Sequence, residues 1–292
     1  MLYRYARILD HCEPYLIATD LIASELNAAP LGVRVPTENR INPQHRRHAE
    51  FLQQLRLMDT LCFGPSSLEM PPWVFYDCAV MPGAVFGLGT RRADLEPWAL
   101  EAMRVPANYD GLVPLSMFIA IPMLPGHDPL SRAPGTPPST WLVYTLDSMN
   151  EVAPGIGPAG LLHLTLALGL RVFPIRTLYA TTQWRNPKLA HYVELGPLEL
   201  ATAYTPAHTM PRTLTFRTPI DEERLASLLM RPATHPLAPP ANVVVDVDDV
   251  ANLRQIQREL ESGVRYELVG APEARGTYVQ APMVRTTAEG RR

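Results

Sequence analysis

The amino-acid sequence predicts a mixed α/β protein with a mostly antiparallel sheet, flanking helices and a small C-terminal appendage. Three observations carry this prediction. Apolar residues make up 47% of the 292 residues and charged residues only 19%, which suits a packed core better than a disordered chain. Amphipathic helical windows alternate with short runs of β-branched and aromatic residues. The 31 prolines confine long helices and central strands to the windows between them.

Charge and cysteine content exclude several classes of protein. The 26 basic and 29 acidic side chains nearly balance, which argues against nucleic acid as a partner. We find no run of about 18 uncharged apolar residues, so no membrane span is expected. The N-terminal residues lack the layout of a secretory signal. Cys12, Cys62 and Cys78 form no CxxC pair, which indicates free thiols in a reducing cytoplasm.

Apolar spacing defines the elements of the first half of the chain. Residues 1–29 carry apolar positions at helical spacing and are expected to form a helix. A second amphipathic helix is predicted over 46–61. The aromatic and β-branched runs 73–80 and 84–89 flank a Met-Pro-Gly turn and are interpreted as a hairpin. A short helix is expected next, followed by a strand in the apolar run 112–124.

The second half alternates strands and helices. Residues 125–139 contain five prolines and are expected to form an exposed, mobile loop. The elements expected after it are strand 141–146, helix 160–170, strand 176–182, helix 186–195, strands 198–204 and 212–218, and helix 221–231. A Pro/Ala-rich linker at 232–241 then leads to a charged helix with Asp248 as its N-cap.

The domain organisation expected from these elements has three parts. Residues 1–44 form an N-terminal helical segment, 45–231 an α/β core, and 232–292 an appended subdomain and tail.

The stretch after strand 141–146 carries the clearest chemical signal. A glycine-rich turn with Gly155 and Gly157 leads directly into the helix at 160, and Pro158 suits a first helical turn. Unpaired backbone N–H groups at a helix N-terminus favour an anion such as a pyrophosphate. The alternative is a glycine turn that only connects two elements.

The motifs around this turn resemble the GNAT acyltransferase superfamily, over roughly residues 45–218. The hexapeptide Val152-Ala-Pro-Gly-Ile-Gly stands where that family has its Q/R-x-x-G-x-G/A pyrophosphate loop, and Asn186-Pro-Lys-Leu-Ala-His-Tyr-Val-Glu-Leu-Gly is similar to the family's N-P-x-A-x-x-x-Y-x-x-x-G. The sequence departs from the pattern in three ways, one of which is that the interval from Asn186 to Tyr192 is one residue short. Val152 replaces a polar or basic residue, and Pro154 lacks an N–H.

The resemblance implies a GNAT-like core, coenzyme A thioester as co-substrate, and a set of site residues. The residues it implies for cofactor binding are Ala153, Gly155, Ile156, Gly157 and Asn186. Tyr192 matches the family's general acid, and it could instead pack its ring under the sheet.

Candidates for the base follow from position in the sequence. Glu151 and Asp147 stand at the end of strand 141–146, where they could also be solvated turn carboxylates. His163 lies one turn into the next helix and could instead be a core residue. No metal site is expected, because the histidine spacing gives no ligand set.

The function expected from the sequence is therefore a biosynthetic acyltransferase that uses an acyl-CoA or acyl-carrier thioester. Its substrate would be a small molecule or a carrier protein, and a homo-oligomer is possible. Five aromatic residues would suit a hydrophobic substrate or a core equally: Trp73, Phe75, Phe86, Phe118 and Trp141. Two alternatives stay open. One is a non-catalytic GNAT-like binding or scaffold protein, which the substituted loop favours, and the other is a different thioester-processing enzyme such as a decarboxylase.

Overall fold

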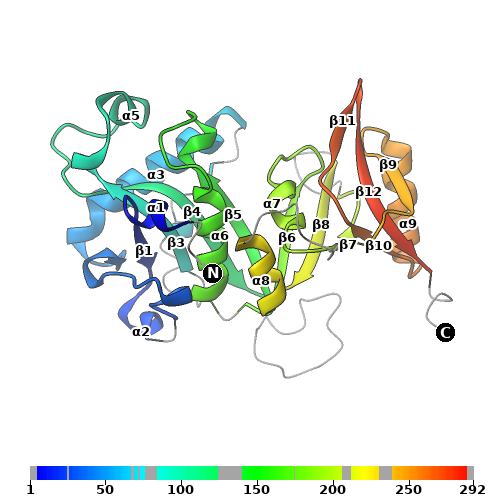
Figure 1. Cartoon of the computed structure of the whole chain (residues 1–292), viewed down its shortest axis with the longest axis horizontal. Helices are drawn as coiled ribbons and strands as arrows, with labels where there is room; N and C mark the ends of the chain where they lie inside the picture. The colour runs from blue at the N-terminus through cyan, green and yellow to red at the C-terminus, as the bar shows by residue number, and fades with distance from the viewer. Residues whose placement is uncertain are drawn as a thin grey trace. The chain divides into compact units, whose positions relative to one another are not determined.

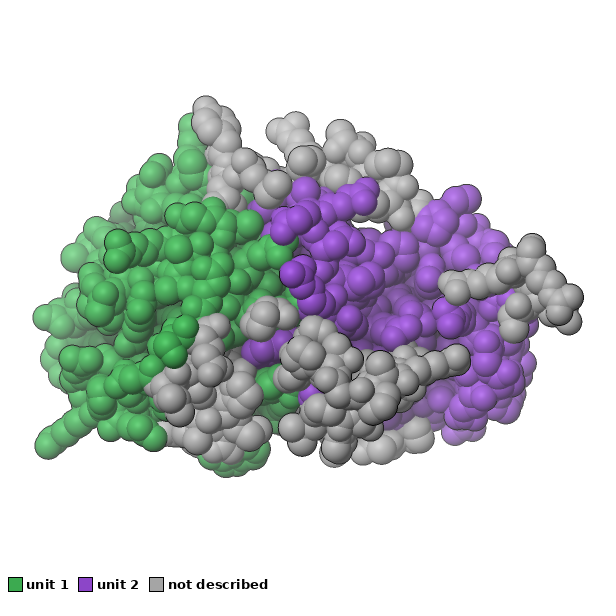
Figure 2. Space-filling view, turned by 90° about the horizontal axis from the view of Figure 1, so that it is seen from below, with its two compact units in different colours: residues 1–122, 143–175 green, residues 123–142, 176–292 purple. Residues whose placement is uncertain are grey.

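The computed structural model describes residues 5–24, 26–66, 69–71, 73–75, 84–123, 140–173, 175–205, 212–229 and 239–287. The chain separates into two compact units (Figure 2). Unit 1 comprises residues 1–122 and 143–175, and unit 2 comprises residues 123–142 and 176–292. These limits differ from those of the three segments expected from the sequence. The three-part domain organisation stays a prediction.

Unit 1 is built on a sheet with the strand order β5-β4-β3-β1-β2. Its strands are β1 (Glu13–Ile17), β2 (Arg40–Ile41), β3 (Ala84–Arg91), β4 (Leu112–Pro122) and β5 (Thr140–Ser148), the last belonging to this unit from Val143 onward. β1 pairs antiparallel with β3 and β3 with β4, whereas β1 and β2 run parallel. The register of β3 against β4 shifts between Leu88 and Gly89, opposite Ser116 and Pro114. This bulge lets β4 continue through Pro114, which cannot donate to the ladder.

Two helices cover opposite faces of this sheet, α3 (Ala49–Phe63) and α6 (Leu161–Val172) (Figure 1). The ring of Phe51 in α3 packs edge-on against Tyr15 of β1, with centroids 4.9 Å apart. Gly169 of α6 lies so close to Phe118 of β4 that an added Cβ would stand 2.4 Å from the ring. Tyr15 and Phe118 lie on different faces, because neighbouring residues of a strand alternate and paired residues share a face.

Shorter elements complete unit 1. They are α1 (Ala6–Leu9), α2 (Asp20–Ala23), α5 (Pro97–Ala102) and the 3₁₀ turns η2 (Pro30–Gly32), η3 (Thr37–Asn39), η4 (Arg46–His48), η5 (Gly64–Ser66), η6 (Arg92–Asp94) and η7 (Met149–Glu151). Each lies between or beside the strands in the chain, and none reaches the length of α3 or α6.

Unit 2 contains a second set of strands in the order β11-β12-β10-β7-β8-β6, with β9 paired to β12. They are β6 (Thr177–Gln183), β7 (Leu198–Thr202), β8 (Thr213–Pro219), β9 (Val243–Asp246), β10 (Arg265–Leu268), β11 (Glu273–Arg275) and β12 (Tyr278–Thr286). The helices are α7 (Leu189–Val193), α8 (Glu222–Leu229) and α9 (Val250–Glu261). β10 pairs antiparallel with β7, so the strands of the C-terminal appendage extend the β6–β8 sheet.

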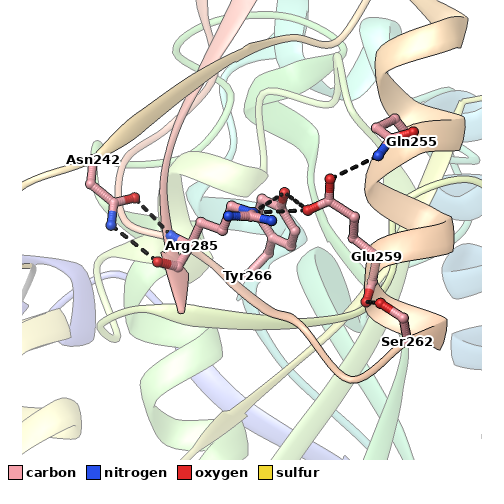
Figure 3. A network of polar contacts seen from close by, with 6 residues as sticks. All are labelled: Asn242, Gln255, Glu259, Ser262, Tyr266 and Arg285. Atoms are coloured by element: carbon pink, nitrogen blue, oxygen red, sulfur yellow. Dashed lines mark hydrogen bonds and ion pairs between the residues drawn. The ribbon is translucent and has the colours of Figure 1, made fainter. Parts of the chain in front are cut away.

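A polar network ties α9 to the end of β12 (Figure 3). Glu259 accepts hydrogen bonds from the Tyr266 hydroxyl at 2.6 Å and from Arg285 Nε at 2.8 Å. The Asn242 side chain bonds both backbone groups of Arg285. Hydrogen bonds from Tyr266, Gln255 and Arg285 lower the pKa of Glu259 from its usual 4.5 to about 2.

The mixed α/β class predicted from the sequence, mostly antiparallel and flanked by helices, is confirmed. So are the helices near 46–61 and 160–170, and strands near 112–124 and 141–146. No helix within the described residues is long and apolar enough to cross a membrane. The expected loop at 125–139 and most of the linker at 232–241 lie outside the described residues.

The predicted helix over residues 1–29 is wrong. Its middle forms strand β1, in which Tyr15, Leu16 and Ile17 are all buried. Pro14 lacks an N–H and disfavours a helix interior, and three consecutive buried residues require contacts on both faces of the backbone. The apolar spacing in this window is therefore compatible with a strand as well as with a helix.

The predicted hairpin at 73–80 and 84–89 is also wrong. β3 pairs along its length with β1 on one side and β4 on the other. Val74 and Phe75 are helical, and residues 76–83 lie outside the described part. The Asp248 cap needs correction as well, since Asp249 caps α9 by accepting from Ala251 N–H at 2.8 Å. Asp248 instead pairs with Arg185 and Arg212.

Candidate functional site

The glycine turn joins the end of β5 to the start of α6 in unit 1. Gly155 has φ +90° and Gly160, the N-cap of α6, has φ +86°, conformations that side-chain-bearing residues rarely adopt. A Cβ added at Gly155 would meet no atom within 4 Å. The turn is therefore open beside Gly155, where a ligand could approach the backbone.

Backbone donors cluster at this turn. Within the described part of the chain, the N–H groups of Gly155, Ala159 and Gly160 have no hydrogen-bond acceptor. The N–H groups of Ala153 and Ile156 are used inside the turn, by Met149 O and Ala153 O. Free donors beside a helix N-terminus favour an anionic group.

The Asn150 side chain holds the other side of the turn through two hydrogen bonds. Its Oδ1 accepts the Gly157 N–H at 2.8 Å, and its Nδ2 donates to Pro158 O at 3.2 Å. The Gly157 donor that the family resemblance assigns to a cofactor is thus engaged within the turn. A Cβ at Gly157 would also stand 2.8 Å from Leu161 Cδ2, so the buried Leu161 side chain would have to shift.

The candidate bases differ in exposure. Glu151 is exposed, as expected of a solvated turn carboxylate, and His163 is half-buried on α6. Asp147 is fully buried, so the alternative of a solvated carboxylate is wrong for this residue. Its Oδ2 accepts from the Thr145 hydroxyl at 2.6 Å.

Asn186 and Tyr192 belong to unit 2. Both ends of the Asn186 amide are engaged, since Nδ2 donates to Thr182 Oγ1 at 2.7 Å and Oδ1 accepts from Lys188 N–H at 2.9 Å. Tyr192 on α7 is 5% exposed, and its ring centroid lies 5.3 Å from that of Phe216. Asn186 thus has a structural role at the start of α7, and Tyr192 combines a packed ring with a polar end.

The aromatic residues expected to line a cavity or a core are mostly core. Phe75, Phe86, Phe118 and Trp141 are at most 3% exposed. Trp73 is 56% exposed and is therefore not part of the core.

Sequence reasoning missed Asp59, a carboxylate buried at the end of α3. It is 2% exposed, and its Oδ2 accepts from Met70 N–H at 2.8 Å. Burial and the charges of Asp147 and Glu69 raise its pKa from 3.8 to about 7. A signal was available, because Asp59 stands four residues after Leu55 on the apolar stripe of that helix.

Comparison with known proteins gives matches among solved structures alone. No family model matches the sequence, and no curated protein matches it. An acetyltransferase assigned to the GNAT family from Desulfovibrio desulfuricans is 13% identical with a TM-score of 0.36, covering 60% of this chain and 94% of its own. NAA60 of Arabidopsis thaliana, solved with a bisubstrate analogue, is 11% identical with a TM-score of 0.37 over 58% and 92%.

MesI, a CoA-dependent acyl-homoserine lactone synthase, is 12% identical with a TM-score of 0.29, over 49% of this chain and 66% of its own. Similarity at these identities and TM-scores does not assign a role to any residue. The chain is weakly similar to GNAT acetyltransferases and acyl-homoserine lactone synthases, and the first of these belong to the superfamily that its sequence motifs resemble.

Proposed function

We propose that the protein transfers an acyl group from a coenzyme A or carrier-protein thioester to an acceptor of unassigned identity. The observation that carries the proposal is the open glycine turn at the N-terminus of α6. There, Gly155 and Gly160 have positive φ, and three backbone N–H groups are available to the pyrophosphate or phosphate of such a donor.

The chemical roles proposed for side chains are those expected from the sequence. Tyr192 would protonate the leaving thiolate, and Glu151 or His163 would accept a proton from the nucleophile. Asp147 is a weaker candidate for direct contact with substrate, because it is fully buried.

Ligand-induced stabilisation tests donor binding. A ligand at about 100 times its dissociation constant stabilises a fold by about 2.7 kcal/mol. We expect CoA, acetyl-CoA or a long-chain acyl-CoA to raise the melting temperature, and acyl-pantetheine, which lacks the pyrophosphate, to do so less. Equal shifts with CoA and pantetheine would remove the turn from the proposal.

A matched pair of glycine variants tests the turn itself. Gly155→Ala places a Cβ in open space and strains a positive φ of +90°. Gly263→Ala does the same at φ +95°, far along the sequence in the loop after α9. Both should lose about 1–2 kcal/mol of stability. We expect Gly155→Ala alone to lose CoA stabilisation, and retention by both variants would contradict the proposed site.

A binding protein without catalysis is the second candidate. It is favoured by Asn150, which occupies the Gly157 N–H, and by Pro154 and Pro158, which have no N–H to offer. No thermal shift with any of the CoA ligands, together with no thiol release from acyl-CoA across a panel of amines, would favour this candidate.

A further inference from the structure

The carboxyl group of Asp59 is one of the most buried ionisable groups of unit 1. Its side chain is 2% exposed at the C-terminal end of α3. Oδ2 accepts from Met70 N–H, whereas Oδ1 is buried and has no hydrogen-bond partner within the described residues. An unpartnered buried oxygen is costly, and a buried negative charge far more so.

The charges that act on Asp59 are all negative. Asp147 of β5 and Glu69, the neighbour of Met70, both disfavour its ionised form. Burial raises the pKa of Tyr15, and the Asp147 charge raises it further. The Met70 N–H is the one interaction that favours the carboxylate over the neutral acid.

Among the described residues, the elements packed most closely against α3 supply no compensating cation at this end, and Arg56, three residues before Asp59 on α3 itself, is exposed. β4 and η5 carry no ionisable side chain, and η7 carries Glu151, another acid. The basic residues Arg46, Arg47 and His48 lie in η4, which precedes the first turn of the 15-residue helix. At 1.5 Å per residue, Asp59 lies more than ten residues, about 15 Å or more, along the axis from them.

A short described segment contacts this carboxyl through its backbone. Residues 69–71 run past the end of α3, with Glu69 and Pro71 exposed and Met70 half-buried between them. The hydrogen bond from Met70 N–H to Asp59 Oδ2 joins this segment to the helix.

We propose that Asp59 is a proton-dependent latch, which holds residues 69–71 against the end of α3 when it is neutral and favours their release when it loses its proton. The neutral acid fits the buried site. The ionised form has an unpartnered oxygen, no counter-cation and two acidic neighbours. Conformations that hydrate the carboxylate are then favoured, and release of residues 69–71 breaks the hydrogen bond that the carboxyl accepts from Met70.

Amide exchange and a carboxyl titration test the latch together. The pKa of Asp59 is about 7 in the closed state and 3.8 when hydrated. Linkage then allows the opening constant of the Met70 amide to rise about tenfold per pH unit, and up to about 10³-fold between pH 4 and 7. We expect this rise by NMR, after correction for the intrinsic exchange rate, with a carbon-detected midpoint near 7 for the Asp59 carboxyl.

Two variants supply the controls. Asp59→Asn imitates the neutral acid and should make the Met70 opening constant independent of pH. Asp94→Asn, at an exposed position of the same unit, should leave the wild-type dependence intact. An Asp59 midpoint near 4, or the same pH slope in wild type and Asp59→Asn, overturns the proposal.

A third variant covers the case in which Asp59→Asn does not fold. Asp147→Asn keeps an acceptor for Thr145 and removes one of the two negative neighbours. It should lower the Asp59 midpoint, so that the rise of the Met70 opening constant levels off at a lower pH and is smaller overall. An unchanged midpoint and an unchanged plateau pH in Asp147→Asn overturn the proposal as well.

Discussion

Tyr192 offers the sharpest separation of an enzyme from a binding protein. Its ring packs against Phe216, so its removal as a whole would confound packing with chemistry. Tyr192→Phe keeps the ring and removes only the hydroxyl. If the hydroxyl is the general acid, we expect thiol release to fall by about 10² to 10⁴ with little change in KM.

The control for this variant is a buried tyrosine with a known structural bond. The Tyr109 hydroxyl donates to Leu112 O in unit 1. Tyr109→Phe should lower stability by about 1 kcal/mol and leave kcat unchanged. Equal kcat values for wild type, Tyr192→Phe and Tyr109→Phe would rule out the acid role.

Glu259 predicts a pH dependence at acid pH. Its pKa is lowered from 4.5 to about 2 by Tyr266, Gln255 and Arg285, so its contribution to stability is present above pH 4.5. That contribution is lost as the pH falls toward 2. Urea unfolding should show that wild type loses more stability than Glu259→Gln over this window. The exposed Glu261→Gln on the same helix should behave as wild type, and parallel curves for all three would contradict the network.

The residues of the candidate site were only partly predictable from the sequence. The turn was identified because its glycines stand between a predicted strand and a predicted helix. The hydrogen bond between Asn150 and Gly157 was not identified, because an asparagine bonds a backbone group seven residues away only once the turn has folded. Asp59 was missed because an amphipathic helix is recognised from the spacing of its apolar residues. A single carboxylate on the apolar face is then taken for a break in that spacing and not for a buried functional group.

At the scale of elements, the contact of α6 with β4 depends on Gly169. Alanine is the better helix former by about 1 kcal/mol, which favours Gly169→Ala. The added Cβ would stand 2.4 Å from the Phe118 ring, and overpacking costs about 1–3 kcal/mol. We therefore expect a net loss of stability in urea, restored in part by Phe118→Leu. A stabilised Gly169→Ala would show that the helix can shift away from the sheet without cost.

Elements in long proline-poor windows were predictable, and pairings between distant segments were not. β5 and α6 follow from local apolar runs with clear ends. β1 and β3 pair across about 70 residues, from Glu13 opposite Gly89 to Ile17 opposite Val85, and no local pattern specifies such a partner. The Met-Pro-Gly turn therefore suggested a hairpin that the long-range pairing replaces.

For the whole molecule, charge predicts solubility. The formal net charge is −3 at pH 7 and the sequence pI is about 6.2. Self-repulsion vanishes near that pH, so we expect minimum solubility there and recovery on either side. Precipitation by polyethylene glycol across pH 5–8 measures this, and a minimum away from pH 6.2 would mean that buried groups such as Asp59 bind protons over this range.

Among the thiols of unit 1, Cys62 near the end of α3 offers a site for selective alkylation. Cys62 follows Asp59 by three residues on the helix and is half-buried, whereas Cys12 is 3% exposed and burial raises its pKa to about 12. Alkylation requires the thiolate, so reagents at neutral pH should modify Cys62 before Cys12. With Cys78 replaced by serine, a fluorophore on Cys62 would place an optical reporter one helical turn from the carboxyl that accepts the Met70 N–H.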